Sequence, residues 1–241
     1  MQNSNFADME PALTSALLLD AFELPPADAI AFLESKGIKI GFNWQTAAAE
    51  AKIKAFSIAG VYRMDILQKV KDKLEIALES GSTLSDFEKS FSDEQILPKY
   101  RLDIIFQTNV QTAYMAGRYK EQIGNVKRNP YWRFRAVLDA STTPICSGLN
   151  NKVFRFDNSI WETFYPPNHF RCRSRVEVLN ETEMTELGLK VINNIPEGVE
   201  QPSNGFDYNP GKKDYKIDFK KYDDNLSKAY KKEMKDFENN L

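Results

Sequence analysis

The stretch "GNVKRNPYWRFRAVLD", residues 124–139, decides the fold class because the spacing of apolar residues changes within it. Before this stretch, apolar residues recur every three or four positions, which is typical of helices that bury one face. Beyond Pro130 they alternate with other residues, which is typical of a half-buried strand. The alternation gives an inner set, Trp132, Phe134, Ala136 and Leu138, and an outer set, Tyr131, Arg133 and Arg135. The sequence therefore predicts an α+β fold whose first long strand has a cationic outer face.

Residues 44–125 are predicted to be mainly helical. In "DILQKVKDKLEIALESG", residues 65–81, Asp65 is the predicted N-cap and Gly81 the predicted stop. One apolar stripe runs between them and comprises Leu67, Val70, Leu74 and Leu78. We expect this stripe to pack against a core, because its members share one face of the helix.

Two further helices are predicted before the change of period. One begins at Ser85, with Glu88 as its capping partner, and a longer one runs from about Pro98 to Gly124. The inner face of the longer helix includes Ala113 and Gly117. Small side chains at these positions would let a neighbouring element approach closely.

Two more strands are predicted after the first. They are "KVFRF", residues 152–156, and "SRVEVL", residues 174–179, and the turn before the former contains asparagines that tolerate a positive φ. Residues 130–180 are thus predicted to form a small antiparallel β unit on a helical body. The expected organisation is a mainly helical region over residues 1–125, a β-containing core over 126–192, and a linker with a C-terminal helical arm over 193–241.

The predicted arm has two parts. From Asn193 onward the chain is rich in Pro, Gly, Asn and Ser, which indicates a linker. An amphipathic helix is then predicted from an aromatic stripe at steps of three and four: Tyr215, Phe219, Tyr222, Leu226, Tyr230, Met234 and Phe237. Such a stripe needs a surface on which to lie.

The composition is that of an ordinary folded protein. Of the 241 residues, 42% are hydrophobic and 27% are charged, which argues against wholesale disorder. The formal net charge of -2 argues against a protein whose whole surface binds nucleic acid. The first 26 residues contain no basic residue, and their apolar run "ALLL" is too short for a signal peptide or a membrane span. We therefore expect the chain in a cytoplasm at synthesis, with no membrane partner.

The chain has one histidine and two cysteines, and they form a candidate metal site. His169 and Cys172 are separated by two residues, a spacing at which one tight loop can present both to a single ion, and Cys146 is the remaining thiol. Three ligands make an incomplete zinc site, so a fourth would come from Asp139, Asp157, water or a second subunit. The alternative is a buried thiol pair beside a histidine that satisfies nearby backbone groups. A disulfide is less expected in a reducing compartment.

The same residues allow an enzymatic interpretation. Cys146 would be the nucleophile, His169 the base and Asp139 the group that orients the base. However, the sequence contains no recognisable oxyanion-hole turn, glycine-rich phosphate loop or nucleophile elbow. The sequence therefore favours a non-enzymatic protein, with a DNA-processing or toxin-like enzyme as the alternative.

Basic charge is concentrated in the middle of the chain. Residues 97–178 contain 13 lysines and arginines against 6 acidic residues, although the whole chain has a net charge of -2. We predict a surface that meets DNA or an acidic partner, formed by Arg118, Arg133, Arg135, Arg171, Arg173 and Arg175. Two alternatives remain: a solvated face with local salt bridges, and a protein-interaction module without DNA contact.

Residues 128–179, "RNPYWRFRAVLDASTTPICSGLNNKVFRFDNSIWETFYPPNHFRCRSRVEVL", resemble the phage Mu F-type minor head protein family, also called phage head morphogenesis proteins. The matching positions are Asp139, Thr142, Cys146, Leu149, Asn150, Asp157, Trp161, Pro166, Pro167, Asn168 and Cys172. Weaker likeness extends the resemblance over about residues 20–180. The chain departs from the pattern at Ser174, which replaces the second cysteine of Cys-Arg-Cys, and at Asn151, which replaces a turn glycine.

The resemblance implies a structural component of a phage or prophage head. Such proteins are associated with the portal, enter the procapsid during assembly, and are implicated in DNA packaging or delivery. The implied partners are the portal protein, scaffold or capsid proteins, and double-stranded DNA. The implied location is the virion, with the host bacterial cytoplasm during assembly.

The segment "FYPPNHFRCRSRV", residues 164–176, combines the scarce residues and is called the hook below. Its two prolines, Pro166 and Pro167, stiffen the loop. We expect His169 and Cys172 to anchor it inward near Cys146. We expect its arginines to project outward by alternation: Arg171, Arg173 and Arg175.

Overall fold

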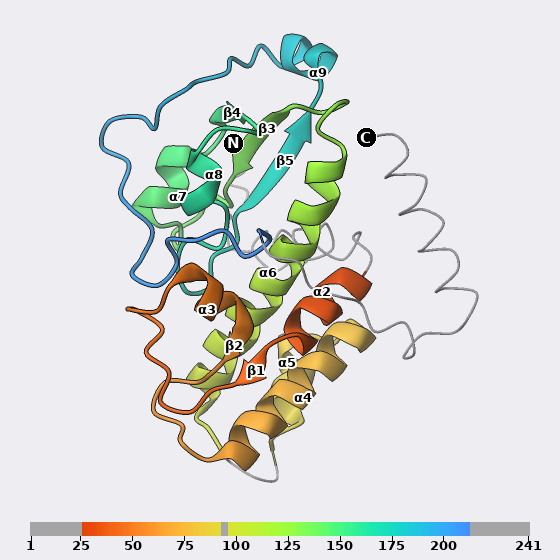
Figure 1. Cartoon of the computed structure of the whole chain (residues 1–241), viewed down its shortest axis with the longest axis vertical. Helices are drawn as coiled ribbons and strands as arrows, with labels where there is room; N and C mark the ends of the chain where they lie inside the picture. The colour runs from red at the N-terminus through yellow and green to blue at the C-terminus, as the bar shows by residue number, and fades with distance from the viewer. Residues whose placement is uncertain (1–25, 93–95, 213–241) are drawn as a thin grey trace, which may run out of the picture.

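The computed structural model describes residues 26–92 and 96–212, and the fold is α+β, as predicted (Figure 1). In chain order the elements are α2 (Pro26–Glu34), β1 (Gly37–Ile38), α3 (Ala49–Lys54), β2 (Ala55–Phe56), α4 (Met64–Ser80), α5 (Leu84–Lys89), α6 (Lys99–Gly124), β3 (Tyr131–Arg135), α7 (Pro144–Leu149), β4 (Val153–Arg155), α8 (Ile160–Thr163), β5 (Arg175–Leu179) and α9 (Glu181–Glu186). The aromatic stripe predicted for residues 215–237 lies outside the described residues.

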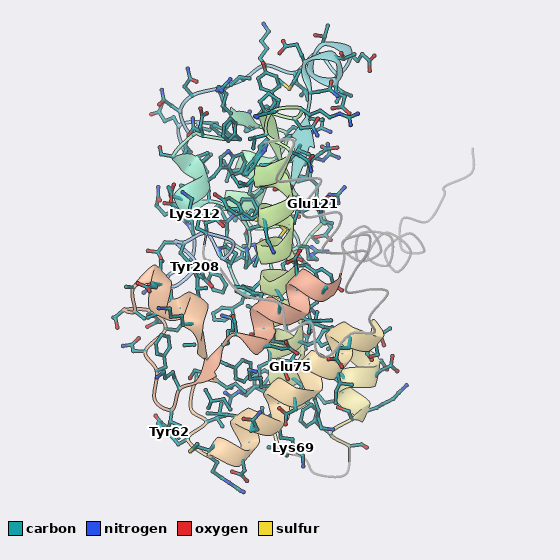
Figure 2. All side chains as sticks on the ribbon, turned by 45° about the vertical axis from the view of Figure 1, so that its right-hand side comes forward. Tyr62, Lys69, Glu75, Glu121, Tyr208 and Lys212 are labelled. Atoms are coloured by element: carbon teal, nitrogen blue, oxygen red, sulfur yellow. The ribbon has the colours of Figure 1, made fainter. Side chains whose placement is uncertain are left out.

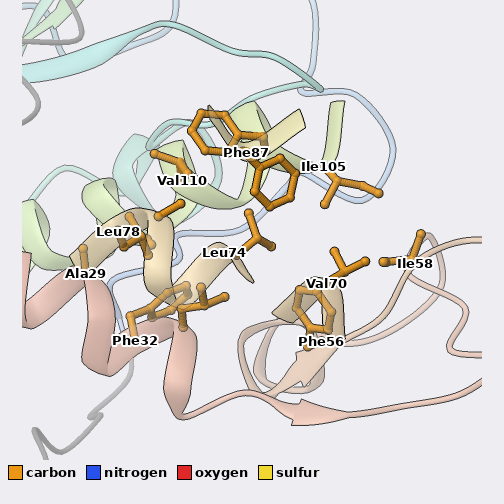
Figure 3. Packing of buried hydrophobic residues seen from close by; sticks show 14 of the residues in the cluster. Ala29, Phe32, Phe56, Ile58, Val70, Leu74, Leu78, Phe87, Ile105 and Val110 are labelled. Carbon is orange, nitrogen blue, oxygen red and sulfur yellow. The ribbon is translucent and has the colours of Figure 1, made fainter. Parts of the chain in front are cut away.

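Helix α4 forms the centre of a helical half. Its predicted stripe is buried: Leu67, Val70 and Leu74 are fully covered and Leu78 is 2% exposed. Figure 3 shows this stripe among side chains from α2, α5, β2 and α6. The helix ends at Gly81, which has a φ of 64°, as predicted. Its N-cap is Arg63 rather than Asp65, so the predicted start was two residues late.

Helices α5 and α6 lie close to their predicted positions. The cap of α5 is a reciprocal pair between Thr83 and Asp86, rather than between Ser85 and Glu88. Helix α6 begins directly after Pro98 and ends at Gly124, as predicted. Its small residues allow α2 to approach, because a Cβ added at Gly117 would lie 3.1 Å from the Cβ of Asp28.

A three-stranded antiparallel sheet with the order β4-β3-β5 forms the other half, as the alternating pattern predicts. Trp132 and Phe134 of β3 are buried on one face, opposite Val178 and Val176 of β5. The turn before β4 places Asn151 at a φ of 62°, the left-handed region expected for this position. Helix α6 runs along both halves and contributes side chains to both cores (Figure 1).

The second face of the sheet is partly covered, so only part of the predicted cationic outer face is exposed. Val153 and Leu179 of this face pack against Met184 from α9, with Leu189 and Val191 beside them. Arg133 is consequently only 9% exposed. The strand also ends earlier than predicted, so Leu138, assigned to the inner set, is 61% exposed.

The helical half contains a buried lysine that the sequence pattern does not reveal. Lys36 is 5% exposed, and its Nζ donates to the carbonyl oxygens of Lys52 at 3.1 Å, Ile53 at 3.0 Å and Ala55 at 3.4 Å. These carbonyls lie where α3 ends and β2 begins, so the lysine satisfies acceptors that the helix leaves open. Burial, and secondarily the charge of Lys71, lowers the pKa of Lys36 to about 7.

Residues 199–212, called the strap below, have irregular backbone, as predicted for the linker, but they are packed. Phe206, Tyr208 and Asn209 are each no more than 3% exposed. Three contacts join the strap to the rest of the chain: Trp44 Nε1 donates to the Gly205 carbonyl at 3.0 Å, Lys52 pairs with Asp207 at 3.0 Å, and Asn209 Nδ2 donates to the Trp161 carbonyl at 2.8 Å. Since these partners come from both halves, the strap connects them, and Figure 2 shows Tyr208 between the two.

Candidate metal site and arginine surface

The hook brings the three scarce side chains together, as expected. Cys146 lies on α7, and its Sγ is 3.3 Å from Nε2 of His169 and 3.8 Å from Sγ of Cys172. All three ligand atoms lie within 4.8 Å of one another. Both thiols are free and buried, and the histidine is half-buried. The site is therefore a compact set of two sulfurs and one nitrogen.

The backbone fixes the orientation of the imidazole. Nδ1 of His169 is 2.7 Å from the carbonyl oxygen of Phe170, which can only accept, so Nδ1 carries the proton. Nε2 then presents its lone pair toward Cys146 in the neutral ring. Burial opposes the charged ring, but hydrogen bonds with Cys146 and the Phe170 carbonyl outweigh burial, so the pKa of His169 is raised.

The two thiols have opposite electrostatic environments. Burial disfavours the Cys172 thiolate, but hydrogen bonds from Cys146, from the Asn168 and Ser174 amides and from the Ser174 side chain lower the pKa of Cys172 to about 7. The hydrogen bond with Cys172 and burial raise the pKa of Cys146 well above its ordinary value. Because the hydrogen bond between the two sulfurs contributes to both shifts, the thiols ionise as a coupled pair.

Neither Asp139 nor Asp157, the carboxylates considered as a fourth metal ligand, joins Cys146, His169 and Cys172. Both oxygens of Asp139 accept from Arg173, each at 2.6 Å, and Asp157 accepts from Arg155 Nε at 3.2 Å. The polar side chain that does act on both sulfurs is that of Ser174, which is 2% exposed and contributes to lowering the pKa of each thiol. The sequence did not single it out as a ligand candidate, although it stands two residues after Cys172.

In the alternative, enzymatic interpretation, Asp139 would orient His169. The structure contradicts this role of Asp139. The Phe170 carbonyl, rather than Asp139, holds Nδ1 of His169. The Arg173 guanidinium binds Asp139 and lowers the pKa of its carboxyl to about 2. The raised pKa of Cys146 also opposes the thiolate that a nucleophile requires.

Comparisons with known proteins give a consistent result. Residues 68–177 match the family described as Phage Mu protein F like protein. The chain is 36% identical over 194 residues to "Putative capsid assembly protein F" of Escherichia phage Mu, which covers 71% of this chain and 44% of the relative.

The chain belongs to the Mu F-like protein family.

It is also 32% identical over 193 residues to "Mu-like prophage FluMu F protein" of Haemophilus influenzae, which covers 72% of this chain and 47% of that relative. The chain thus spans less than half the length of these two relatives. No solved structure matches this Mu F-like protein.

Several motif residues of this Mu F-like chain serve its local structure. Asn150 Oδ1 accepts from the Ala136 amide at 3.0 Å, and Trp161 Nε1 donates to the Arg155 carbonyl at 2.9 Å. Asn168 is fully buried, and neither polar atom of its side chain has a hydrogen-bond partner among residues 26–92 and 96–212. Part of the resemblance therefore reflects turns and packing.

The predicted arginine surface is largely neutralised by the Mu F-like chain's own carboxylates. Arg133 donates through Nε to Glu177 at 2.6 Å, and its guanidinium pairs with that carboxylate inside the covered face. In the hook, Arg171 pairs with Asp103 and Arg173 with Asp139. Of these three, Arg133 is buried, whereas Arg171 and Arg173 reach the surface but are paired there with carboxylates of the chain.

The remaining basic residues of this surface take no part in the three ion pairs named above. Arg135 donates to the Asn151 side chain at 2.8 Å and lies 4.0 Å from Glu177, while Arg118 and Arg175 are half-buried. Lys127 and Arg128, in the turn between α6 and β3, are exposed and have no ion pair within the described part of the chain. Within the described residues, this turn thus offers two exposed cationic groups outside ion pairs, whereas Arg171 and Arg173 of the hook are paired.

No helix within the two described ranges has the length and the hydrophobicity to cross a membrane.

Proposed function

We propose that this chain is a non-enzymatic component of a phage or prophage head that acts in head assembly. The observation that carries the proposal is the 36% identity to a protein named capsid assembly protein F, extending over 71% of this chain. The chemistry of the site supports the non-enzymatic part. Its histidine is held by a backbone carbonyl, its nearest carboxylate is occupied by an arginine, and the thiol beside the histidine resists ionisation.

We propose further that the protein acts at the portal, in DNA packaging or delivery, inside the virion and in the host cytoplasm during assembly. The two halves are joined by α6 and by the strap, so the described part of the chain can hold two surfaces in a fixed relation. The helical half would contact portal, scaffold or capsid proteins. The β half would face the anionic partner.

The proposed anionic partner is double-stranded DNA, and the proposed primary contacts are Lys127, Arg128 and Arg135. These groups are exposed or only weakly engaged, so a phosphate would not first have to displace a carboxylate. Arg118, Arg171, Arg173 and Arg175 would contribute only at closer approach, and Arg133 is buried. The second candidate function is a protein-interaction module, which the intramolecular ion pairs of Arg171 and Arg173 favour.

A genetic experiment tests the assembly role. The gene would be inactivated in the phage or prophage that carries it, and DNA-filled heads would be counted by electron microscopy. We expect few filled heads, restoration by the wild-type gene, and co-purification of the protein with heads and with the portal protein. A normal yield of infectious particles, without the protein in purified heads, would contradict the proposal.

A salt titration separates DNA contact from a pure protein-interaction module. Duplex DNA affinity should fall as salt rises, because bound cations release counterions from the phosphates. Changing Lys127 and Arg128 together to glutamine removes two contacts, which should reduce the logarithmic salt slope by about 2. The matched control is the double change of Lys39 and Lys99, two exposed lysines of the helical half, to glutamine. Absent or salt-independent binding would leave the protein-interaction module.

A further inference from the structure

We propose that Cys146, His169 and Cys172 bind one zinc-like divalent ion, whose fourth ligand is an oxygen supplied by Ser174 or by a water molecule that Ser174 holds. The proposal goes beyond head assembly and does not depend on it. It assigns the hook a metal that would fasten it to α7.

The separations of the ligand atoms fit a tetrahedral ion. Zinc bonds of about 2.3 Å to sulfur and about 2.0 Å to nitrogen place two ligating sulfurs about 3.8 Å apart, and a sulfur and a nitrogen about 3.5 Å apart. In this protein, the two sulfurs are 3.8 Å apart, and Sγ of Cys146 is 3.3 Å from Nε2 of His169. The third pair, Sγ of Cys172 and Nε2 of His169, lies within 4.8 Å, so these two atoms would approach each other when an ion enters. A disulfide would require the sulfurs to approach to about 2.05 Å.

The histidine is prepared for coordination. A metal-binding histidine usually donates its other ring N–H to a carbonyl or carboxylate, which fixes the tautomer and the ring orientation. Nδ1 of His169 makes such a bond to the Phe170 carbonyl, at 2.7 Å. The lone pair of Nε2 is then directed to the side where both sulfurs lie, and it accepts a hydrogen bond from Cys146 that an ion would replace.

The hook also holds Cys172 in a suitable backbone environment. Its own amide donates to the His169 carbonyl at 3.3 Å, which closes a tight turn between two of the ligands. The amides of Asn168 and Ser174 donate to its sulfur, and such bonds stabilise the thiolate that a metal requires. The backbone therefore positions the ligands before any ion binds.

The fourth position distinguishes this site from a closed structural zinc site. Ser174 is buried on the hook two residues after Cys172, so its hydroxyl is the side-chain oxygen that we assign to the fourth position. A neutral oxygen is a weaker ligand for a soft ion than a thiolate is. We therefore expect a site that holds zinc but exchanges it more readily than a closed site. Replacing Ser174 with cysteine should close it.

The experiment uses the full chain, kept reduced with a phosphine and freed of metal by a chelator. Zinc affinity would be measured by competition with a chromogenic chelator, and cobalt(II) would report geometry by its thiolate charge-transfer and tetrahedral d–d absorption. We expect one equivalent per chain. Cys172→Ser and His169→Gln should each weaken binding by on the order of a hundredfold, because each removes one protein ligand.

The decisive comparison is Ser174→Cys, which should tighten zinc binding by on the order of tenfold or more. The control, Ser85→Cys, adds an exposed thiol on α5 and should leave affinity and the cobalt spectrum unchanged. Circular dichroism would verify that each variant folds. If Cys172→Ser fails to fold, His169→Gln, at a half-buried position, still provides the test.

Three results would overturn the proposal. The first is that folded, reduced wild-type protein takes up no zinc or cobalt, even when Ser174→Cys takes up one equivalent. The second is that wild-type protein and His169→Gln bind zinc equally well. The third is a cobalt spectrum without thiolate bands, in which case the site is a hydrogen-bonded thiol pair.

Discussion

Changing Gly211 to alanine should loosen the strap. A Cβ at this position would lie 2.7 Å from Cγ and 2.8 Å from Cδ1 of Tyr119, and still closer to its Cβ. Carbon atoms in contact lie about 3.5–4.0 Å apart, so one of the two segments must move by about 1 Å. Tyr119 cannot yield easily, because its Cβ is fixed to the backbone of α6 and its ring packs edge-on against Trp132 and Tyr165.

The expected cost is the strain of overpacking, about 1–3 kcal/mol. We expect the strap to relieve the strain by withdrawing toward solvent, which would loosen Tyr208 and Phe206, and each such side chain contributes about 1.5–3 kcal/mol when fully buried. We therefore expect the free energy of unfolding to fall by up to about 3 kcal/mol. We also expect chymotrypsin to cleave at these two aromatic residues faster than in wild-type protein.

Urea unfolding and timed digestion followed by mass spectrometry would measure both effects. The matched control is Gly37→Ala, because an added Cβ there meets only the Lys54 carbonyl oxygen, at 3.9 Å. If the Gly211 variant equals this control in stability and in cleavage rate, the strap does not pack on α6 as described.

Three other substitutions test the two cores and the hook. Leu74→Ala in α4 should reduce the free energy of unfolding by about 2.7–5 kcal/mol, since the side chain is fully buried. Ile76→Ala, at a 59% exposed position, should reduce it far less. Equal losses in urea unfolding would contradict the assigned core. Arg133→Met should reduce the free energy of unfolding by about 1–3 kcal/mol, because Glu177 loses its closest ion-pair partner. In a double-mutant cycle, adding Glu177→Gln should recover part of this loss. If the effects of the two substitutions simply add, the ion pair is refuted. Arg173 lowers the pKa of Asp139 to about 2, so the charged carboxylate stabilises the fold at pH values above its ordinary pKa of about 3.9. This contribution disappears as the pH falls from there toward 2. Asp139→Asn should therefore flatten the plot of unfolding free energy against pH in this range, and an unchanged plot would exclude the linkage.

The sequence was sufficient to predict the helices and strands that are set by neighbouring residues. The stripe on α4, the stop at Gly81, the long helix after Pro98 and the three antiparallel strands all follow from periodicity, caps and turn residues. The helix starts were less well predicted, because several residues near each start can serve as caps. The meeting of Cys146 with the hook was also expected, since the chain has so few thiol and imidazole groups.

The tertiary structure alone decided which charges are free and which segments are packed. Arg133 alternates like an outward residue, but the chain from α9 to Val191 covers that face, and its partner Glu177 is 44 positions away. The strap has a linker's composition, yet Lys52 pairs with Asp207 across 155 positions. Periodicity reports which side of an element a residue occupies. It does not report what lies against that side, because covering segments and ion-pair partners come from distant parts of the chain.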